Sequence, residues 1–357
     1  MLPLRGLRFL ELGGMGPAPF AGMMLADNGA TGLRIVRPGA GAAASAGALE
    51  RNRPFLELDL KSDSGRRRAL DLAGAADIVI EGFRPGKLEQ LNLSPRDLQR
   101  DNPRLVICRV TGWGQEGPLA QVAGHDLNFI SLCGALHLMG PADRPPLPPL
   151  NLVGDFGGGM MCAFAALAGV LAARATGQGQ VVDCAMTDAA AVMMTWMFDE
   201  RSAGRWSDVR GTNQTDGSMP CYRTYETADG GYLAVAAIEP RFFANLAEMI
   251  GLEDGAAMLA NRNAWPALAA RLEHIFRNRT LQEWTDFLEG TDTCCTPVLA
   301  PGEAPRHPHN QARDAFRVTG GTVEPAPAPR FHAADGAVRP AWPAGSDDLS
   351  QWLPARG

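Results

Sequence analysis

The sequence lacks several features that mark nucleic-acid-binding, secreted and membrane-spanning proteins. Its 33 lysines and arginines are outnumbered by 39 aspartates and glutamates, whereas a nucleic-acid-binding domain normally presents a basic face. The first residues contain no long apolar stretch of the kind found in secretory signals. The longest apolar run, residues 160–173, is too short to span a bilayer, and the last residues carry no peroxisomal signal of the SKL type. We therefore expect a cytoplasmic protein that binds neither nucleic acid nor membrane.

Cysteine pairs and metal-ligand spacings are also missing. The seven cysteines include no C-x-x-C motif, so the sequence indicates neither a zinc site nor a thiol redox motif. Cys162 and Cys184 stand among apolar residues and are expected in the core, while the adjacent Cys294 and Cys295 are unlike a structural disulfide. Because 46% of the residues are hydrophobic, a substantial core can form. These features predict a reduced protein that contains no metal.

The familiar phosphate-binding loops are absent as well. The glycine-rich turn at residues 13–16 does not have the G-x-G-x-x-G spacing of a dinucleotide fingerprint, and no G-x-x-x-x-G-K-S/T loop occurs. Pro17 and Pro19 follow this turn directly, and proline is well suited to the first turn of a helix. We therefore interpret residues 13–16 as a connection from a strand to a helix and not as an NAD site.

The order of strand-like and helix-like segments predicts an α/β protein. A strand over residues 7–12, a helix over 17–28 and a strand over 33–36 form a β–α–β opening, which is typical of a parallel sheet. Further strands are expected over residues 78–80, 105–110 and 181–183. The first half of the chain therefore predicts a large, Rossmann-like, doubly wound parallel sheet.

The second half predicts a smaller α+β domain. Residues 232–236 resemble a strand, apolar side chains recur at helical spacing over 242–250, and Thr280 and Glu283 form a capping-box pattern. We predict four parts, namely a large domain over 1–188, a linker helix over 189–215, a small domain over 216–310, and a return segment over 311–357 that packs on the large domain.

Three acidic or basic side chains stand beside glycine-rich segments in the first half. His125 and Asp126 lie at the expected start of a helix, where Asp126 could be an ordinary N-cap and His125 could be a polar neighbour or a proton carrier. Asp155 precedes three glycines that open a long apolar helix. It could cap that helix, or it could be a reactive carboxylate; the glycines indicate that something approaches the backbone closely at this point.

Several strings carry a resemblance to a known family. LDLKS, EGFRPG, TGWGQEGP, GHDLNF and LNLVGDFGGG occur in this order, and together they resemble the α-methylacyl-CoA racemases of the class III CoA-transferase superfamily. The likeness runs over nearly the whole chain. It implies the class III CoA-transferase fold, with a large and a small domain, and an interlocked homodimer.

The resemblance implies roles for four residues in catalysis. His125 and Asp155 would be the two acid/base groups on opposite faces of the α-carbon of the substrate. Asn151 would orient Asp155, and Glu239 of the partner subunit would hydrogen-bond His125. CoA would be held by side chains and backbone groups of the following residues: Arg37, Leu58, Asp59, Leu60, Lys61, Gly82, Phe83, Arg84, Gly124, Asp126, Leu127, Asn128 and Phe129.

This sequence also departs from the racemase pattern. Gln90 stands where racemases tend to have a basic residue, and Phe83 and Phe129 replace tyrosines. Taken without the resemblance, Arg37 would be interpreted as a solvated surface residue at the end of a strand. The methionines at 160, 161, 193, 194 and 197 are expected in the core, with an adaptable wall for an acyl chain as the alternative.

The function implied is racemisation or epimerisation of 2-methylacyl-CoA thioesters by proton transfer at the α-carbon through an enolate. Such a reaction needs two positioned acid/base groups and backbone N–H groups near Asp126 to stabilise the thioester oxygen. No cofactor is expected, because CoA is part of the substrate. The alternative is a CoA-transferase in which Asp155 attacks the thioester as a nucleophile; a CoA-binding protein without catalysis is a third hypothesis. His125 favours the racemase, since a transferase does not need it.

Overall fold

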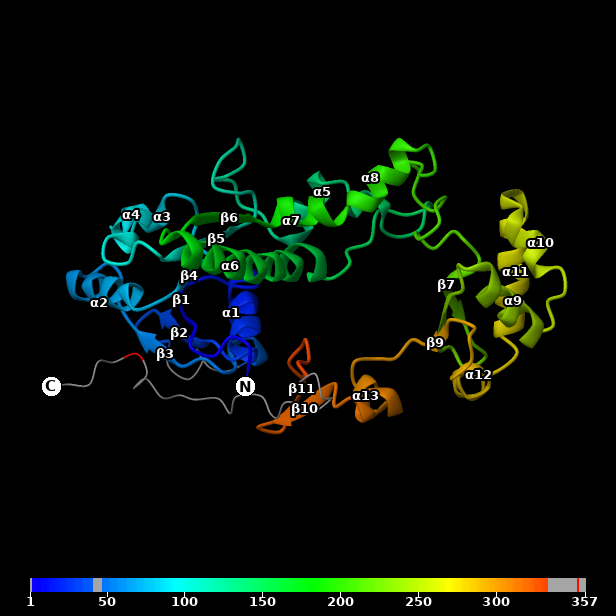
Figure 1. Cartoon of the computed structure of the whole chain (residues 1–357). Helices are drawn as coiled ribbons and strands as arrows, with labels where there is room; N and C mark the ends of the chain where they lie inside the picture. The colour runs from blue at the N-terminus through cyan, green and yellow to red at the C-terminus, as the bar shows by residue number, and fades with distance from the viewer. Residues whose placement is uncertain (1, 41–46, 333–351, 353–357) are drawn as a thin grey trace. The chain divides into compact units, whose positions relative to one another are not determined.

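The computed structural model describes residues 2–40, 47–332 and 352, and the chain forms two compact units (Figure 1). The large unit comprises the described residues of Met1–Ala135, Pro149–Met194 and Val318–Gly357. The small unit comprises Leu136–Pro148 and Thr195–Arg317. The chain therefore leaves the large unit and returns to it at the C-terminal end, so the large unit is discontinuous in sequence.

The large unit is built on a six-stranded parallel sheet in the order β3-β2-β1-β4-β5-β6. Its strands are β1 (Arg8–Leu12), β2 (Thr31–Val36), β3 (Phe55–Glu57), β4 (Ile78–Glu81), β5 (Val106–Thr111) and β6 (Val181–Ala185). Five of these were expected from the sequence, within a residue or two at each end. β3 was not expected, because three residues carry too little alternation to be recognised. The doubly wound parallel sheet is confirmed, with its change of direction between β1 and β4.

Helices cover both faces of this sheet because β1 alternates its side chains between two apolar clusters. Phe9 belongs to a cluster that includes α1 (Pro17–Asp27) and α6 (Gly157–Thr176). Leu10 belongs to the opposite cluster, which includes α2 (Asp63–Gly74), α3 (Lys87–Gln90) and α4 (Pro95–Gln99). Pro17 occupies the first turn of α1, as the sequence predicts. The large unit also contains α5 (Asp126–Leu132) and α7 (Met186–Met193).

The three glycines that open α6 allow this helix to pack closely. A Cβ atom at Gly158 would lie 2.7 Å from Cγ of Met186, and one at Gly159 would lie 2.6 Å from the carbonyl oxygen of Pro17. Both distances are too short for real contacts, so the expectation of a close approach to this backbone is confirmed. The glycines thereby bring the start of α6 against α1 and α7.

The apolar segment around α6 is longer than the sequence suggested. Among the described residues, Leu152–Thr176 is one helical segment of 25 residues that is long and apolar enough to cross a membrane, by length and composition alone. It packs against α1, β5 and α7 within the large unit. A core helix of a folded domain passes the same test, and here 44% of the apolar window is buried.

The small unit contains an antiparallel sheet in the order β7-β8-β9. Its strands are β7 (Tyr222–Glu226), β8 (Tyr232–Ala236) and β9 (Cys295–Pro297), and its helices include α8 (Thr195–Ser202), α9 (Pro240–Met249), α10 (Gly255–Ala260), α11 (Trp265–Phe276) and α12 (Leu281–Leu288). Thr280 and Glu283 form the capping box of α12, as the sequence predicts. Where we expected one linker helix over 189–215, the structure has the end of α7, α8 and a loop.

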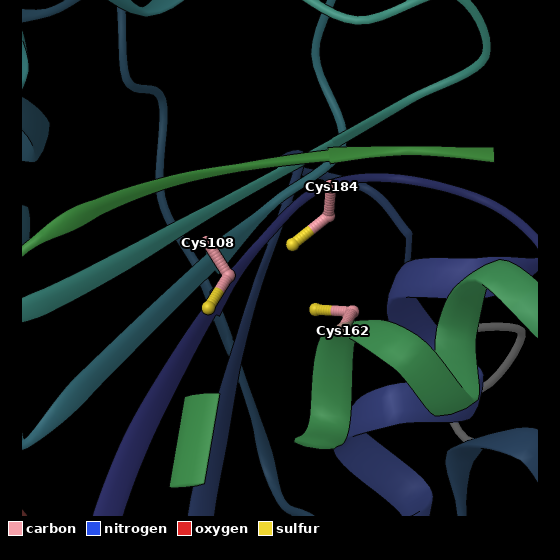
Figure 2. A group of neighbouring side chains, drawn as sticks. All are labelled: Cys108, Cys162 and Cys184. Atoms are coloured by element: carbon pink, nitrogen blue, oxygen red, sulfur yellow. The ribbon is translucent and has the colours of Figure 1, made fainter. Parts of the chain in front are cut away.

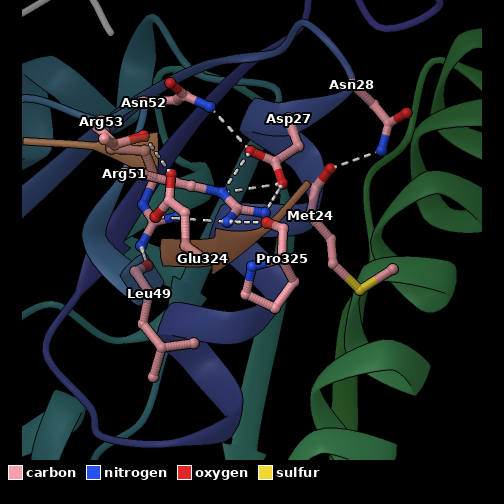
Figure 3. A network of polar contacts seen from close by, with 10 residues as sticks. Met24, Asp27, Asn28, Leu49, Arg51, Asn52, Arg53, Glu324 and Pro325 are labelled. Carbon is pink, nitrogen blue, oxygen red and sulfur yellow. Dashed lines mark hydrogen bonds and ion pairs between the residues drawn. The ribbon is translucent and has the colours of Figure 1, made fainter. Parts of the chain in front are cut away.

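The small unit ends with α13 (Pro308–Ala312), which overlaps only the start of the expected return segment. The return segment contains a hairpin of β10 (Phe316–Thr319) and β11 (Thr322–Pro325). Within the large unit, the Arg51 guanidinium donates to the carbonyl oxygen of Pro325 at 2.8 Å and to Oδ2 of Asp27 at 2.5 Å, while Asn52 donates to Oδ1 of Asp27 (Figure 3). We call this arrangement the Arg51 clasp. Much of the rest of the expected return segment, residues 333–351 and 353–357, lies outside the described residues, but Trp352 is buried in the cluster that includes α2.

Candidate active site

A cavity of about 340 Å³ lies in the large unit, where β1, β4 and β5 end. Its lining comes from the segments that follow those strands and from the starts of α1, α5 and α7. In open α/β sheets, ligands bind at the carboxyl ends of the strands, near the point where the strand order reverses. The lining residues are Met15, Gly16, Pro17, Ala18, Gly82, Phe83, Arg84, Pro85, Val110, Thr111, Gly112, Trp113, Ala120, Val122, Ala123, Gly124, His125, Phe129, Asp155 and Met186.

His125 lines this cavity from the position just before α5. Its backbone is extended (φ −131°), and its N–H donates to Oδ1 of Asn128 at 3.1 Å. The sequence suggested Asp126 as the possible N-cap, and this is wrong by one residue: His125 is the N-cap, and Asp126 is the first residue of the helix. Asp126 turns inward and is buried, so its carboxylate is available to the neighbouring segment instead of to its own helix.

Asp155 lines the same cavity from a π-helical turn, Leu152–Phe156, that leads into α6. The sequence left open whether Asp155 caps α6, but the N-cap of α6 is Phe156. The Asn151 side chain donates to Oδ2 of Asp155 at 3.2 Å, and the Asp155 backbone N–H donates to Oδ1 of Asp126 at 2.8 Å. The structure thus puts Asn151 in the position that the orienting role requires.

The surroundings of Asp155 raise the pKa of its carboxyl group. Burial raises the pKa of Asp155 above the ordinary aspartate value, and the negative charge of Asp126 raises it further. The hydrogen bond from Asn151 and the attraction of His125 act in the opposite direction and only partly offset this. The cavity is therefore lined by an imidazole and by a carboxyl group whose pKa is raised, and groups of these two kinds can take part in general acid/base chemistry.

The glycine-rich turn before α1 contacts the Asp155 carboxylate. Gly16 has a left-handed backbone (φ +65°), and a Cβ atom there would lie 3.1 Å from Oδ2 of Asp155. The interpretation of residues 13–16 as a strand-to-helix turn is correct, yet the sequence gave no indication that this turn reaches Asp155. The close approach accounts for glycine at position 16.

Part of the predicted CoA-binding set lies at the cavity. Gly82, Phe83, Arg84, Gly124 and Phe129 line it. Asp126, Leu127 and Asn128 belong to the first turn of α5, which begins at the same place, but they are not in the lining.

The Phe83 backbone is fixed by a hydrogen bond to the buried Glu81 side chain. Oε2 of Glu81 accepts from the Phe83 N–H at 2.8 Å, and Oε1 of Glu81 accepts from Nε of Arg109 at 2.7 Å. Nη1 of Arg109 also donates to Oε1 of Glu89 at 2.8 Å. Burial raises the pKa of Glu81 above the ordinary glutamate value, although the hydrogen bond from Arg109 acts against this. The loop after β4 therefore rests on a buried ion pair between β4 and β5.

The other predicted residues are not in the cavity lining. Arg37 is exposed just after β2. Leu58, Asp59, Leu60 and Lys61 follow the edge strand β3. Glu239 belongs to the small unit, where it is the N-cap of α9, and Gln90 is exposed at the end of α3.

Sequence reasoning assigned no role to Trp113 or Met186, although both line the cavity. The Trp113 ring meets the Phe129 ring edge-on, with 4.8 Å between their centroids. The position of Trp113, two residues past the end of a central strand, was the available signal. Of the methionines expected in the core, Met194 is buried, whereas Met160 and Met193 are about half exposed (54% and 48%), which corrects that expectation.

A second cavity and a cluster of three cysteines lie apart from the cavity of His125 and Asp155. The small unit has a larger cavity of about 910 Å³ that contacts Asp216, Arg223, Arg262 and Trp265, but the His125–Asp155 pair is not there. In the large unit, the sulfur atoms of Cys108, Cys162 and Cys184 lie within 4.8 Å of one another (Figure 2).

The three thiols belong to the apolar cluster between the sheet and α6. Hydrogen bonds to the neighbouring sulfurs and burial raise the pKa of Cys162 well above that of an ordinary thiol. Three thiolates around a divalent ion would also leave an unneutralised charge in an apolar interior, which is costly. The cluster is therefore best described as core packing, as predicted for Cys162 and Cys184.

Residues 4–348 match the family described as CoA-transferase family III. The chain belongs to this family. It is 40% identical to the alpha-methylacyl-CoA racemase of Mus musculus over 328 residues, which cover 91% of this chain and 85% of that protein. It is 39% identical to the Homo sapiens protein of the same name over 331 residues, covering 92% and 86%. The fold is similar to that of a CAIB/BAIF family protein from Brucella suis (TM-score 0.79, 24% identity, covering 94% of each chain).

Proposed function

We propose that this protein racemises 2-methylacyl-CoA thioesters, with His125 and Asp155 as the two acid/base groups. The observation that carries the proposal is that an imidazole and a carboxyl group with a raised pKa line one cavity at the carboxyl end of the sheet. The high identity to racemases supports the same reaction class. In the cell we expect the reaction in the cytoplasm, as a step in fatty-acid metabolism.

The chemistry proposed is a proton transfer across the α-carbon. In one direction neutral His125 accepts the α-proton, the electron pair of the C–H bond forms the enolate, and protonated Asp155 returns a proton to the opposite face. In the other direction the two groups exchange roles. Backbone N–H groups near Asp126 would stabilise the enolate oxygen. No cofactor takes part in this proposal, because the thioester itself acidifies the α-proton.

The test is incubation of the purified protein with (2R)-2-methylacyl-CoA in heavy water. We expect loss of chirality together with deuterium at the α-carbon, without an added acceptor acid. His125→Ala and Asp155→Ala should each lower this rate by about 10²-fold or more, with circular dichroism as the control for folding. Rates like those of the wild type in either variant would contradict the assignment.

The CoA-transferase alternative makes a different prediction for Asp155. A transferase would form a covalent bond between this carboxyl group and CoA during turnover, whereas a racemase never forms a bond to Asp155. Intact-mass spectrometry during turnover should therefore show no added CoA. An adduct of that mass, absent from Asp155→Ala, would establish the transferase.

We also propose that the active unit is a homodimer in which Glu239 of one chain completes the site around His125 of the other. Support comes from an exposed apolar surface on α6 and α7 of the large unit, formed by Met160, Phe164, Leu171, Val192 and Met193. Exposed apolar surface of this kind marks interaction sites.

Co-expression of inactive His125→Ala and Glu239→Ala chains tests this arrangement. Each heterodimer regains one complete site, so part of the activity should return. If mass spectrometry verifies the heterodimers and no activity returns, the site is not shared between chains.

A further inference from the structure

Asp126 is placed to act on Asp155 in two ways. It is the first residue of α5, it is buried, and its Oδ1 accepts the Asp155 backbone N–H at 2.8 Å. The two residues are 29 positions apart in sequence, so this contact joins the segment of His125 to the segment of Asp155. It is the kind of contact that sets the relative position of two reacting groups.

The neighbouring glycine is required by this contact. A Cβ atom at Gly154 would lie 2.5 Å from Oδ1 of Asp126 and 3.3 Å from its Cα. Any larger side chain at position 154 would push the Asp126 carboxylate away from the Asp155 N–H. The pair Gly154–Asp155 and the pair His125–Asp126 thus fit each other as one unit.

The charges that face Asp155 come from few places. The turn Leu152–Phe156 packs against α1, α5, α6 and α7. α5 and its N-cap supply Asp126 and His125, the groups whose charges act on Asp155. α7 carries Asp188 in its first turn, and α6 carries Arg174 in its last turn, far along the helix. α1 carries Asp27 at its last position. Among the described residues, Asp126 is the carboxylate whose negative charge acts on Asp155.

We propose that Asp126 is the positioning residue of the acid/base pair: one of its oxygens accepts the Asp155 N–H and fixes the turn that carries Asp155 against the segment of His125, and its negative charge acts on the Asp155 carboxyl group. This inference rests on the proposed racemase function and adds a residue to it. In a two-base reaction, one group of the pair must hold a proton and the other must be free to accept one before each turnover. Asp126 acts through Asp155 and has no direct contact with the α-carbon of the substrate.

The two effects can be separated by substitution. Asp126→Asn keeps an oxygen acceptor for the Asp155 N–H and removes the charge, while Asp126→Ala removes both. Asp77→Asn is the matched control, because Oδ2 of Asp77 also accepts a distant backbone N–H, that of Arg8, at 2.8 Å. Asp77 lies at the amino ends of β1 and β4, at the opposite edge of the sheet from the cavity.

Two measurements are made on each variant. The first is a ¹³C NMR titration of protein labelled at the aspartate carboxyl carbons, with the Asp155 signal assigned from Asp155→Asn. The second is the pH dependence of kcat/KM for α-proton exchange. In Asp126→Asn we expect the Asp155 titration, and with it the acid limb of the rate profile, to move to lower pH by about half a unit to one unit. Asp126→Ala should also have a kcat about tenfold lower than that of Asp126→Asn, because it loses the acceptor for the Asp155 N–H. Asp77→Asn should behave as the wild type.

The outcomes for the two proposals differ. If the wild type shows no α-proton exchange, the racemase proposal fails, and the NMR titration still decides the effect of Asp126 on Asp155. If exchange occurs but Asp155 titrates at the same pH in Asp126→Asn as in the wild type, the inference about Asp126 is overturned and the racemase proposal stands. Circular dichroism of Asp126→Asn checks its fold, so the test holds even if Asp126→Ala does not fold.

Discussion

Individual residues near the cavity show how closely the backbone and the reacting groups are fitted. Gly16 and Asp126 lie against the Asp155 segment, Gly154 within that segment leaves room for Asp126, and none of the three belongs to the acid/base pair itself. Their effect is to fix one carboxyl group in place and to limit its contact with water. Fixed positions of this kind lower the entropy that a reaction must lose.

Gly16→Ala should therefore reduce activity more than it reduces stability. The added methyl group meets Oδ2 of Asp155 at 3.1 Å and displaces the carboxyl group, and we expect kcat to fall by about tenfold or more. Gly177→Ala is the control, because Gly177 also has a positive φ (+79°) but nothing within 4 Å of the added atom. Both variants should lose about 1 kcal/mol of stability. Equal activity in the two would show that Gly16 is needed for the turn alone.

The raised pKa of Asp155 also predicts a pH dependence of stability. Because its pKa is higher in the folded than in the unfolded protein, this group favours folding at low pH, and that contribution is lost as the pH rises through the folded value. Asp155→Asn removes the titration. The difference in melting temperature, variant minus wild type, should therefore become more positive from acidic to neutral pH when both proteins are measured by calorimetry. A difference that does not change with pH would contradict the raised pKa.

For individual residues, the sequence indicated which side chains belong to the candidate site better than it indicated which residues contact one another. The segments of His125 and Asp155 were recognised from their strings, and the roles assigned to them remain predictions. The contact of Gly16 with Asp155 could not be predicted, because it joins turns more than 130 positions apart in sequence. Nor could the inward direction of Asp126, since an aspartate at a helix start is normally interpreted as a cap.

Among the elements, neighbouring strands place charged side chains opposite one another beneath the cavity. The parallel register of β4 and β5 pairs Glu81 with Arg109, and Glu81 in turn holds the Phe83 N–H. Both side chains are buried. A buried pair of this kind adds little net stability, but its disruption leaves an unpaired charge in the interior.

Arg109→Met should destabilise the protein by about 3–5 kcal/mol, because Glu81 then lacks its partner. The KM for acyl-CoA should also rise, since the Phe83 loop loses its support. The double variant Glu81→Gln/Arg109→Met should recover part of the stability, as measured by urea unfolding. If the double variant is as unstable as the sum of the single variants, the ion pair is not the cause.

The sequence was most informative about the helices and strands. Apolar runs and turn residues predicted β1, β2, β4, β5 and β6 because buried parallel strands have continuous apolar stretches. The short β3 and the division of the expected linker between α7 and α8 were missed. A three-residue strand and a one-residue helix break depend on contacts that are distant in sequence, and local patterns do not record them.

The molecule as a whole is organised by a chain that leaves the large unit and comes back to it. The Arg51 clasp is one of the contacts that hold the returning residues, through Pro325 and Glu324. Its members are largely buried, with side-chain exposures of 9% for Arg51 and 2% for Asp27. The pattern of the sequence predicted a return segment, but it did not predict this contact.

Arg51→Met should loosen the return segment and leave the Asp27 carboxylate without its main partner. We expect faster proteolytic cleavage near residues 318–332 and a loss of about 3 kcal/mol or more in stability. The double variant Asp27→Asn/Arg51→Met should regain stability but keep the faster cleavage, because the Pro325 contact is still missing. Cleavage at the rate of the wild type in both variants would show that the clasp does not hold this segment.

The same clasp sets an order of events while the protein is being made. The last strand of the large sheet, β6, ends at Ala185, but Pro325 is translated on the order of 140 residues later. At ordinary rates of synthesis that interval lasts on the order of ten seconds. A sheet that forms within this interval lacks the contacts of Arg51 with Pro325 and Glu324. A chain that ends before Pro325 therefore leaves uncovered one side of Arg51, a residue that is largely buried in the finished protein.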